Sequence, residues 1–255
     1  MKTCANHWET NMKKLILSTA ALALSAGFAL AESHGATVRM GTEGAYPPYN
    51  FINDAGQVDG FERELGDELC ARAQLTCEWV TNDWDSIIPN LVSGNYDTII
   101  AGMSITEERA KVIDFTEAYY PAAPSAYVGL KADADIKTGV VAAQTSTIQA
   151  AYVAESGATL LEYPTADETI AAVRNGEADA VFADKDFLAP IVAESNGELT
   201  YVGGDVSVGD GVGMGIRKSD AELKDKFNAQ IEAMKADGSL NELIKKWFGE
   251  AGLVF

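Results

Sequence analysis

Apolar residues recur along the chain with helical and strand-like spacings. Phe61, Leu65 and Leu69 lie four residues apart, which predicts a helix face that ends near Gln74. Short apolar runs predict strands at 37–41, 77–81 and 96–101. Residues 84–92 predict a helix, which stops at Ser93-Gly94. The first part of the chain therefore has the order β-α-β-α-β.

A second series of the same kind follows a proline-rich connection at residues 119–124. Strands are predicted at 139–142, 159–163, 179–183 and 199–202, and helices at 146–155, 166–175 and 186–194. Residues 206–215 contain four glycines and predict a flexible connection, and two amphipathic helices end the chain. Strands that alternate with helices are typical of parallel α/β sheets, so two series predict two lobes with a cleft between them.

The N-terminal region has the pattern of an export signal. Lys13 and Lys14 precede an apolar run at 15–30, and Ala29-Leu30-Ala31 is a small-x-small cleavage site. The alternative is a membrane anchor, but the run is shorter than the roughly 20 residues that a span needs. We expect residues 1–31 to be an N-terminal extension and a cleaved signal peptide, with the true start at Met1 or Met12. The mature chain would then lie in the periplasm.

Charge and histidine content exclude several function classes. The 255 residues include 19 Lys and Arg against 38 Asp and Glu, a net charge of -19 that argues against nucleic acid as a partner. The two histidines, His7 and His34, both lie near the N-terminus. A Ser-His-Asp site or a histidine-ligated zinc in the rest of the chain is therefore excluded.

Cleavage after Ala31 would remove Cys4 and leave Cys70 and Cys77 as an even pair. In an oxidising compartment such a pair predicts a disulfide, which would tie the end of a helix to the next strand. Two buried free thiols are the alternative.

Seven segments of the mature chain resemble the periplasmic solute-binding proteins of polar amino-acid ABC importers, family 3 of the bacterial extracellular solute-binding proteins. They are residues 41–48 (GTEGAYPP), 58–62 (VDGFE), 84–91 (WDSIIPNL), 101–109 (AGMSITEER), 213–218 (GMGIRK), 236–240 (ADGSL) and 246–248 (KWF). The Cys70/Cys77 pair also matches a disulfide of some members.

The resemblance implies the type II periplasmic-binding-protein fold, in which each lobe is a mainly parallel sheet flanked by helices. Lobe 1 would comprise 36–122 and 213–255, and lobe 2 would comprise 126–209, with hinge strands near 122–126 and 209–213. The implied function is delivery of a free amino acid to an inner-membrane ABC permease, by a monomer that uses no cofactor and does no chemistry.

A free amino acid presents a carboxylate and an ammonium, and the sequence offers a partner for each. Arg109 suits the carboxylate because a guanidinium matches it as a two-pronged fork. The resemblance adds the Gly102 amide and the Ser104 hydroxyl, and counts Ala101 among the ligand-binding residues. Asp184, at the end of a predicted strand, would pair with the ammonium. The alternatives are a surface ion pair of Arg109 with Glu107 or Glu108, and a helix cap by Asp184.

The resemblance also assigns a loop of the second lobe to the ligand carboxylate. Thr147 would offer its amide and hydroxyl, whereas Thr145 stands where the family has glycine. Capping of the following helix is the alternative for Thr147.

The side-chain pocket of the ligand would come from Glu43, Tyr46 and Trp84. The resemblance places the two aromatic residues against the ligand side chain, although a core position is the alternative for Trp84. Glu43 would be a surplus buried carboxylate, which is costly unless it meets a cation. We therefore expect arginine, ornithine, lysine or a basic derivative, with glutamine or another polar amino acid as the alternative if Glu43 faces water.

Two rival functions remain open at this stage. Periplasmic cyclohexadienyl dehydratases resemble these binding proteins and would use carboxylate acid–base groups. The sensor lobe of a signalling receptor is the second rival, and the chain ends at Phe255 without a predicted membrane segment.

Overall fold

The computed structural model describes residues 37–255. The predicted signal peptide, its cleavage site and the alternative starts lie outside these residues. No helix within residues 37–255 is both long enough and apolar enough to cross a membrane.

The described chain forms three sheets and eight α-helices, with two short 3-10 turns at Trp84–Ser86 and Gly249–Ala251. The strands are β1 Val38–Thr42, β2 Ala45–Tyr46, β3 Asn50–Ile52, β4 Val58–Asp59, β5 Cys77–Thr81, β6 Thr98–Ile99, β7 Asp114–Phe115, β8 Ser125–Gly129, β9 Val140–Gln144, β10 Thr159–Tyr163, β11 Ala180–Asp184, β12 Thr200–Val206 and β13 Gly215–Ile216. The helices are α1 Phe61–Arg72, α2 Ile87–Val92, α3 Glu107–Ala110, α4 Ile148–Ser156, α5 Ala166–Arg174, α6 Lys185–Glu194, α7 Ala221–Asp237 and α8 Ser239–Phe248.

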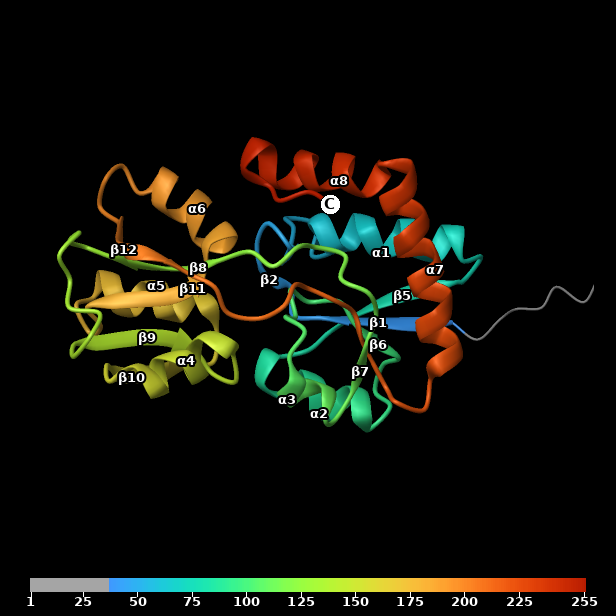
Figure 1. Ribbon diagram of the computed structural model, residues 1–255, viewed down its shortest axis with the longest axis horizontal. Coiled ribbons are helices and arrows are strands. Elements are labelled where there is room, and N and C mark those ends of the chain that lie inside the picture. The colour runs from blue at the N-terminus through green and yellow to red at the C-terminus, as the bar shows by residue number, and fades with distance from the viewer. Residues whose placement is uncertain (1–36) are drawn as a thin grey trace, which may run out of the picture. The chain divides into compact units, whose positions relative to one another are not determined.

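The first lobe is built on a five-stranded sheet in the order β5-β1-β6-β13-β7. In Figure 1 helices α1 and α8 lie over one side of this sheet, and α2 and α3 lie over the other. The buried side chains of α1 include Phe61, Leu65 and Leu69, so the predicted i+4 stripe is the face that the helix buries. The small antiparallel sheet β2-β3-β4 precedes α1 in the chain.

The second lobe is built on a five-stranded sheet in the order β10-β9-β11-β8-β12. Helices α4 and α5 pack against β9, β10 and β11, and α6 packs against β8, β11 and β12. The chain enters this lobe after β7 and returns to the first sheet at β13 (Figure 1). The two-lobe α/β class predicted from the sequence is therefore confirmed.

The strand directions are more mixed than the sequence suggested. In the first sheet β5, β1 and β6 are parallel, whereas β13 is antiparallel to both β6 and β7. In the second sheet β10, β9 and β11 are parallel, whereas β8 is antiparallel to both β11 and β12. The physical reason is the path of the chain between lobes: it leaves through β7 and β8 and returns through β12 and β13. The two crossing strands of each lobe are therefore antiparallel to one another: β7 and β13 in the first lobe, and β8 and β12 in the second.

Several elements differ from the predictions. Strand β8 was missed, because all five of its residues are buried and follow the proline-rich segment, so no alternation marks it. The predicted strand at 96–101 is only two residues long. The glycine-rich connection at 206–215 is more ordered than expected, since Val212 forms antiparallel bridges with Ser104 and Tyr120. The predicted hinge strands and lobe boundaries stay predictions.

Helix α1 begins where the Pro47-Pro48 loop returns to the sheet. The carbonyls of Pro48 and Tyr49 accept the first helix amides, those of Phe61 and Glu62, at 3.0 and 2.8 Å. Gly60 has φ 117°, and a Cβ there would lie 2.5 Å from the Tyr49 carbonyl oxygen, so only glycine allows this contact. The helix start thus fixes the loop that carries two tyrosines.

The disulfide is confirmed: Cys70 in α1 is bonded to Cys77 at the start of β5, with a Cα–Cα distance of 6.3 Å.

Candidate functional site

A pocket lies between the two lobes, with about 330 Å³ of empty space that includes a part open to solvent. Nine of the ten predicted site residues line it, and the structure adds three from the second lobe. The predicted ones are Glu43, Tyr46, Trp84, Ala101, Gly102, Ser104, Arg109, Thr147 and Asp184, and the added ones are Gln144, Ile148 and Gln149.

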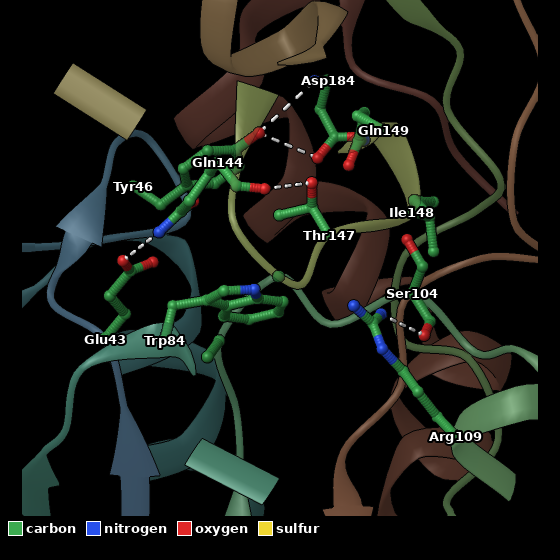
Figure 2. Close-up of a pocket in the computed structure, with 12 residues that line it drawn as sticks. Glu43, Tyr46, Trp84, Ser104, Arg109, Gln144, Thr147, Ile148, Gln149 and Asp184 are labelled. Carbon is green, nitrogen blue, oxygen red and sulfur yellow. Dashed lines mark hydrogen bonds between the residues drawn. The ribbon is translucent and has the colours of Figure 1, made fainter. Parts of the chain in front are cut away.

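Arg109 reaches the pocket from the short helix α3. Its guanidinium donates to the carbonyl of Ser104 at 2.9 Å (Figure 2). Across the lobes, it also donates to the carbonyl of Ser146 at 3.3 Å. It also lies 5.3 Å from the ring centroid of Trp84. Burial lowers the pKa of Arg109 to about 10. Glu108 pairs instead with Lys111, so the alternative of a surface ion pair for Arg109 is not what the structure has.

Asp184 ends strand β11 and enters the pocket from the second lobe. Its carboxylate accepts hydrogen bonds from Tyr46 Oη at 2.9 Å, Gln149 Nε2 at 2.8 Å and Ser125 Oγ at 3.5 Å. Asp184 occupies the N-cap position of α6, but its side chain accepts no capping hydrogen bond. Burial raises the pKa of Asp184 to about 6. The carboxylate therefore lines the pocket and does not cap the helix.

Glu43 faces the pocket, which answers a question that the sequence left open. Its Oε1 accepts a hydrogen bond from Gln144 Nε2 at 2.6 Å, and this bond joins the two lobes (Figure 2). Burial raises the pKa of Glu43 to about 7, against the lowering effect of the Gln144 bond. A carboxylate in this position favours a cation beside it.

The aromatic wall consists of Tyr46 and Trp84. The Tyr46 ring stacks on Phe187 of the second lobe with centroids 4.3 Å apart, while its hydroxyl reaches Asp184. Trp84 lines the pocket and also belongs to the hydrophobic cluster of the first lobe, so the core alternative holds, and its contact with a ligand stays a prediction. Its indole Nε1 is buried without a hydrogen-bond partner among residues 37–255.

Gly102 lines the pocket, but its amide has another partner. The N–H donates to Oε1 of Glu62 at 2.6 Å, and Asn50 Nδ2 donates to Oε2 at 2.7 Å. Tyr119 Oη donates to the same carboxylate, which is fully buried. The amide that we expected to bind a ligand carboxylate is therefore occupied by a side chain 40 residues away.

Thr147 and Thr145 differ in their placement. The Thr147 hydroxyl accepts from the Ala150 amide at 3.1 Å and donates to the Gln144 carbonyl at 2.7 Å, so it caps α4 while lining the pocket. Thr145 is outside the pocket lining, and its amide donates to the Tyr163 carbonyl at 2.9 Å. Thr147 therefore caps α4, which was the alternative for this residue. The Thr145 amide is used in a backbone hydrogen bond to the neighbouring strand.

Two α/β lobes with a small, charged and aromatic pocket between them define a protein built to enclose a small polar molecule. Residues 38–250 match the family model of the bacterial extracellular solute-binding proteins, family 3, and the chain belongs to this family.

Relatives of known name cover nearly the whole chain. The L-arginine-binding protein of Pseudomonas aeruginosa is 34% identical over 93% of this chain and 97% of its own length. The lysine/arginine/ornithine-binding periplasmic protein of Escherichia coli is 33% identical with the same coverage. A crystal structure of a periplasmic His/Glu/Gln/Arg/opine family-binding protein from Silicibacter pomeroyi, in complex with lysine, is 73% identical. It covers 86% of this chain and 100% of its own, with a TM-score of 0.84.

Proposed function

We propose that the protein is the periplasmic substrate-binding component of an ABC importer and binds a free basic L-amino acid between its lobes. Arginine, ornithine and lysine are the expected ligands, and the protein does no chemistry on them. Its membership of the family and the names of its relatives support this assignment.

The observation that carries the choice of ligand is the charge balance of the pocket. Glu43 and Asp184 supply two carboxylates and Arg109 supplies one guanidinium, a net charge of -1 when all three are ionised. A basic amino acid brings two cations and one carboxylate, so the enclosed site becomes neutral. Glutamine would leave one carboxylate without a counter-charge, which is costly in a buried site. The burial that raises the pKa of Glu43 to about 7 shows how unfavourable an uncompensated charge is at this position.

Each ligand group then has a proposed partner. Arg109 binds the α-carboxylate, Asp184 accepts from the α-ammonium, and Glu43 meets the basic end of the side chain between Tyr46 and Trp84. Ser104 and Thr147 complete the lining.

Titration calorimetry against arginine, lysine, ornithine, histidine, glutamine and glutamate tests the proposal. We expect the first three to bind most tightly. Glu43→Gln should weaken arginine binding by about 2–5 kcal/mol, roughly 30-fold or more, and change glutamine binding little. Arg109→Lys keeps the charge but loses the fork, and should weaken every ligand. Glu162→Gln, on the exposed side of β10, is the matched control.

A wild-type protein that binds glutamate or aliphatic amino acids and ignores basic ones would contradict the proposal. Incubation with prephenate or arogenate addresses the enzymatic rival, and product formation at catalytic protein concentrations would establish it.

A further inference from the structure

Beside the pocket, the two lobes meet at a second polar contact. The junction of β11 and α6 reads Asp184-Lys185-Asp186, and only the first of these residues lines the pocket. Lys185 pairs with Asp205 at 2.7 Å within the second lobe. Asp186 has no ion-pair partner among residues 37–255, and its carboxylate turns instead to the other lobe.

Two tyrosine hydroxyls converge on one oxygen of that carboxylate. Tyr120 Oη donates to Asp186 Oδ2 at 2.8 Å, and Tyr49 Oη donates to the same atom at 3.4 Å. Both rings are buried, with 0% and 2% of their surface exposed. Hydrogen bonds to an ionised acceptor are about twice as strong as those between neutral groups.

The tyrosines are held by the core of the first lobe. The Tyr49 ring packs edge-on against Phe61 and Phe248, with centroids 6.4 and 4.9 Å away. Tyr120 stacks on Phe248 at 4.7 Å and stands on the segment that crosses to the second lobe. The hydroxyls are therefore presented rigidly, so little side-chain entropy is lost when Asp186 meets them.

We propose that Asp186 is a positioning residue that latches the lobes together through Tyr49 and Tyr120 without touching the ligand. The inference rests on the proposed function, because it sets how strongly the same site binds. The bonds join an α6 residue to residues packed in the first lobe, and the latch requires that they break when the lobes separate. A contact made in one of two conformations shifts the equilibrium toward that conformation.

Loss of the latch and loss of a ligand contact should change the measured ligand affinities in different ways. If open and closed states are both populated before any ligand arrives, losing the latch reduces the fraction of competent protein and weakens every ligand by one common factor. A residue that contacts the ligand, such as Glu43, changes the ratio of affinities between ligands.

The experiment measures lysine, arginine and glutamine affinities for the wild type, Asp186→Ala, Tyr120→Phe and the double variant. We expect each single variant to weaken all three ligands about tenfold by the same factor, since a hydrogen bond to a charged group is lost. The double variant should lose little more than Asp186→Ala alone, because Asp186→Ala already removes the bond that Tyr120→Phe removes. Tyr163→Phe is the matched control, since its hydroxyl donates to Glu177 within the second lobe at 2.8 Å; it should change affinity less than twofold.

Unchanged affinities in folded Asp186→Ala and Tyr120→Phe would overturn the latch, as would factors that differ more than threefold between ligands. If Asp186→Ala does not fold, Tyr49→Phe replaces it, with a smaller expected loss because its bond is longer. Should the wild type bind none of the three amino acids, the proposed function fails. Small-angle scattering then decides the latch alone: the ligand-free variants must populate a more open state than the wild type.

Discussion

Binding of a basic amino acid should strengthen as the pH rises from about 5 to 7. The change in pH acts on Glu43, because burial raises the pKa of its carboxyl group to about 7. Below that pH the carboxylate is largely protonated, and a guanidinium or ammonium beside it can bind only if the proton leaves. A cation therefore releases about one proton per ligand, and its apparent affinity rises with pH.

The magnitude follows from the pKa. From pH 5 to a pKa of about 7 is roughly two units, and each unit corresponds to about 1.36 kcal/mol. Arginine binding should thus be weaker by about 2.7 kcal/mol, roughly a hundredfold, at pH 5 than above pH 7. Asp184, with a pKa of about 6, adds up to about one further unit. That second effect concerns the α-ammonium, so glutamine shares it, and the ratio of arginine to glutamine affinity isolates Glu43.

The sign for the protein without ligand is opposite. Glu and Asp have pKa values near 4 in an unfolded chain, so the folded state binds more protons than the unfolded one between about pH 4 and 7. The stabilisation from protonated Glu43 and Asp184 is complete below about pH 4. It is lost as the pH rises through about 6 for Asp184 and about 7 for Glu43. Arginine should reverse this slope.

Calorimetry at pH 5, 6, 7 and 8, in buffers of different ionisation enthalpy, measures both the affinity and the protons released. Glu43→Gln should keep only the shallow slope due to Asp184. The reasoning would be refuted if arginine and glutamine affinities changed in parallel, or if Glu43→Gln kept the full slope.

Two further outcomes are expected. Glu62→Gln should lower the free energy of unfolding in urea by about 1–3 kcal/mol, because one buried donor loses its acceptor; Glu64→Gln in the same helix, a partly exposed ion-pair residue, should cost below about 1 kcal/mol, and equal losses would contradict the account. The intact mass of periplasmic material should be that of a chain beginning at Glu32 with Cys70 bonded to Cys77, and reduction should cost about 2–3 kcal/mol of stability; a retained leader or two free thiols would contradict it.

The sequence predicted the parts of the site that depend on residue type at an element's end. Asp184 stands at the carboxyl end of a recognisable strand. Arg109 lies in the short helix α3, where the hydroxyl of the N-cap residue Thr106 accepts the Arg109 amide. Strand ends at the sheet edge are where α/β proteins place ligand groups. The family resemblance, together with this local pattern, therefore placed the charged members at the pocket.

Gln144 and Gln149 were missed, although a signal for the first was present. Gln144 ends β9, which is parallel to and beside β11, so its side chain emerges at the same sheet edge as Asp184. Gln149 is a buried polar residue in the first turn of α4, and no helical spacing distinguishes it from a surface amide. Its role depends on the Asp184 carboxylate that it meets across the lobe.

The sequence does not show which residues, far apart in the chain, compete for the same hydrogen-bond donor. The Gly102 amide was assigned to the ligand because of its motif, yet Glu62 takes it from a helix of the same lobe. The buried Glu62 must find donors, and it finds three, since an unpaired carboxylate in the core would be costly. Only the packed fold shows which donors are left for a ligand.

That competition changes how a ligand carboxylate would be recognised. With the Gly102 amide on Glu62 and the Thr147 hydroxyl capping α4, the predicted partners that remain are Arg109, the Ser104 hydroxyl and the Thr147 amide, and Arg109 is the one that carries a charge. Two of its five N–H donors are held by carbonyls, Ser104 from its own lobe and Ser146 from the other, which fixes the plane of the guanidinium. Because the Ser146 bond joins the two lobes, Arg109 would lose one of these two contacts if the lobes separated. Closure and carboxylate recognition would therefore reinforce each other, and Asp186, by favouring closure, would prepare Arg109 for its ligand.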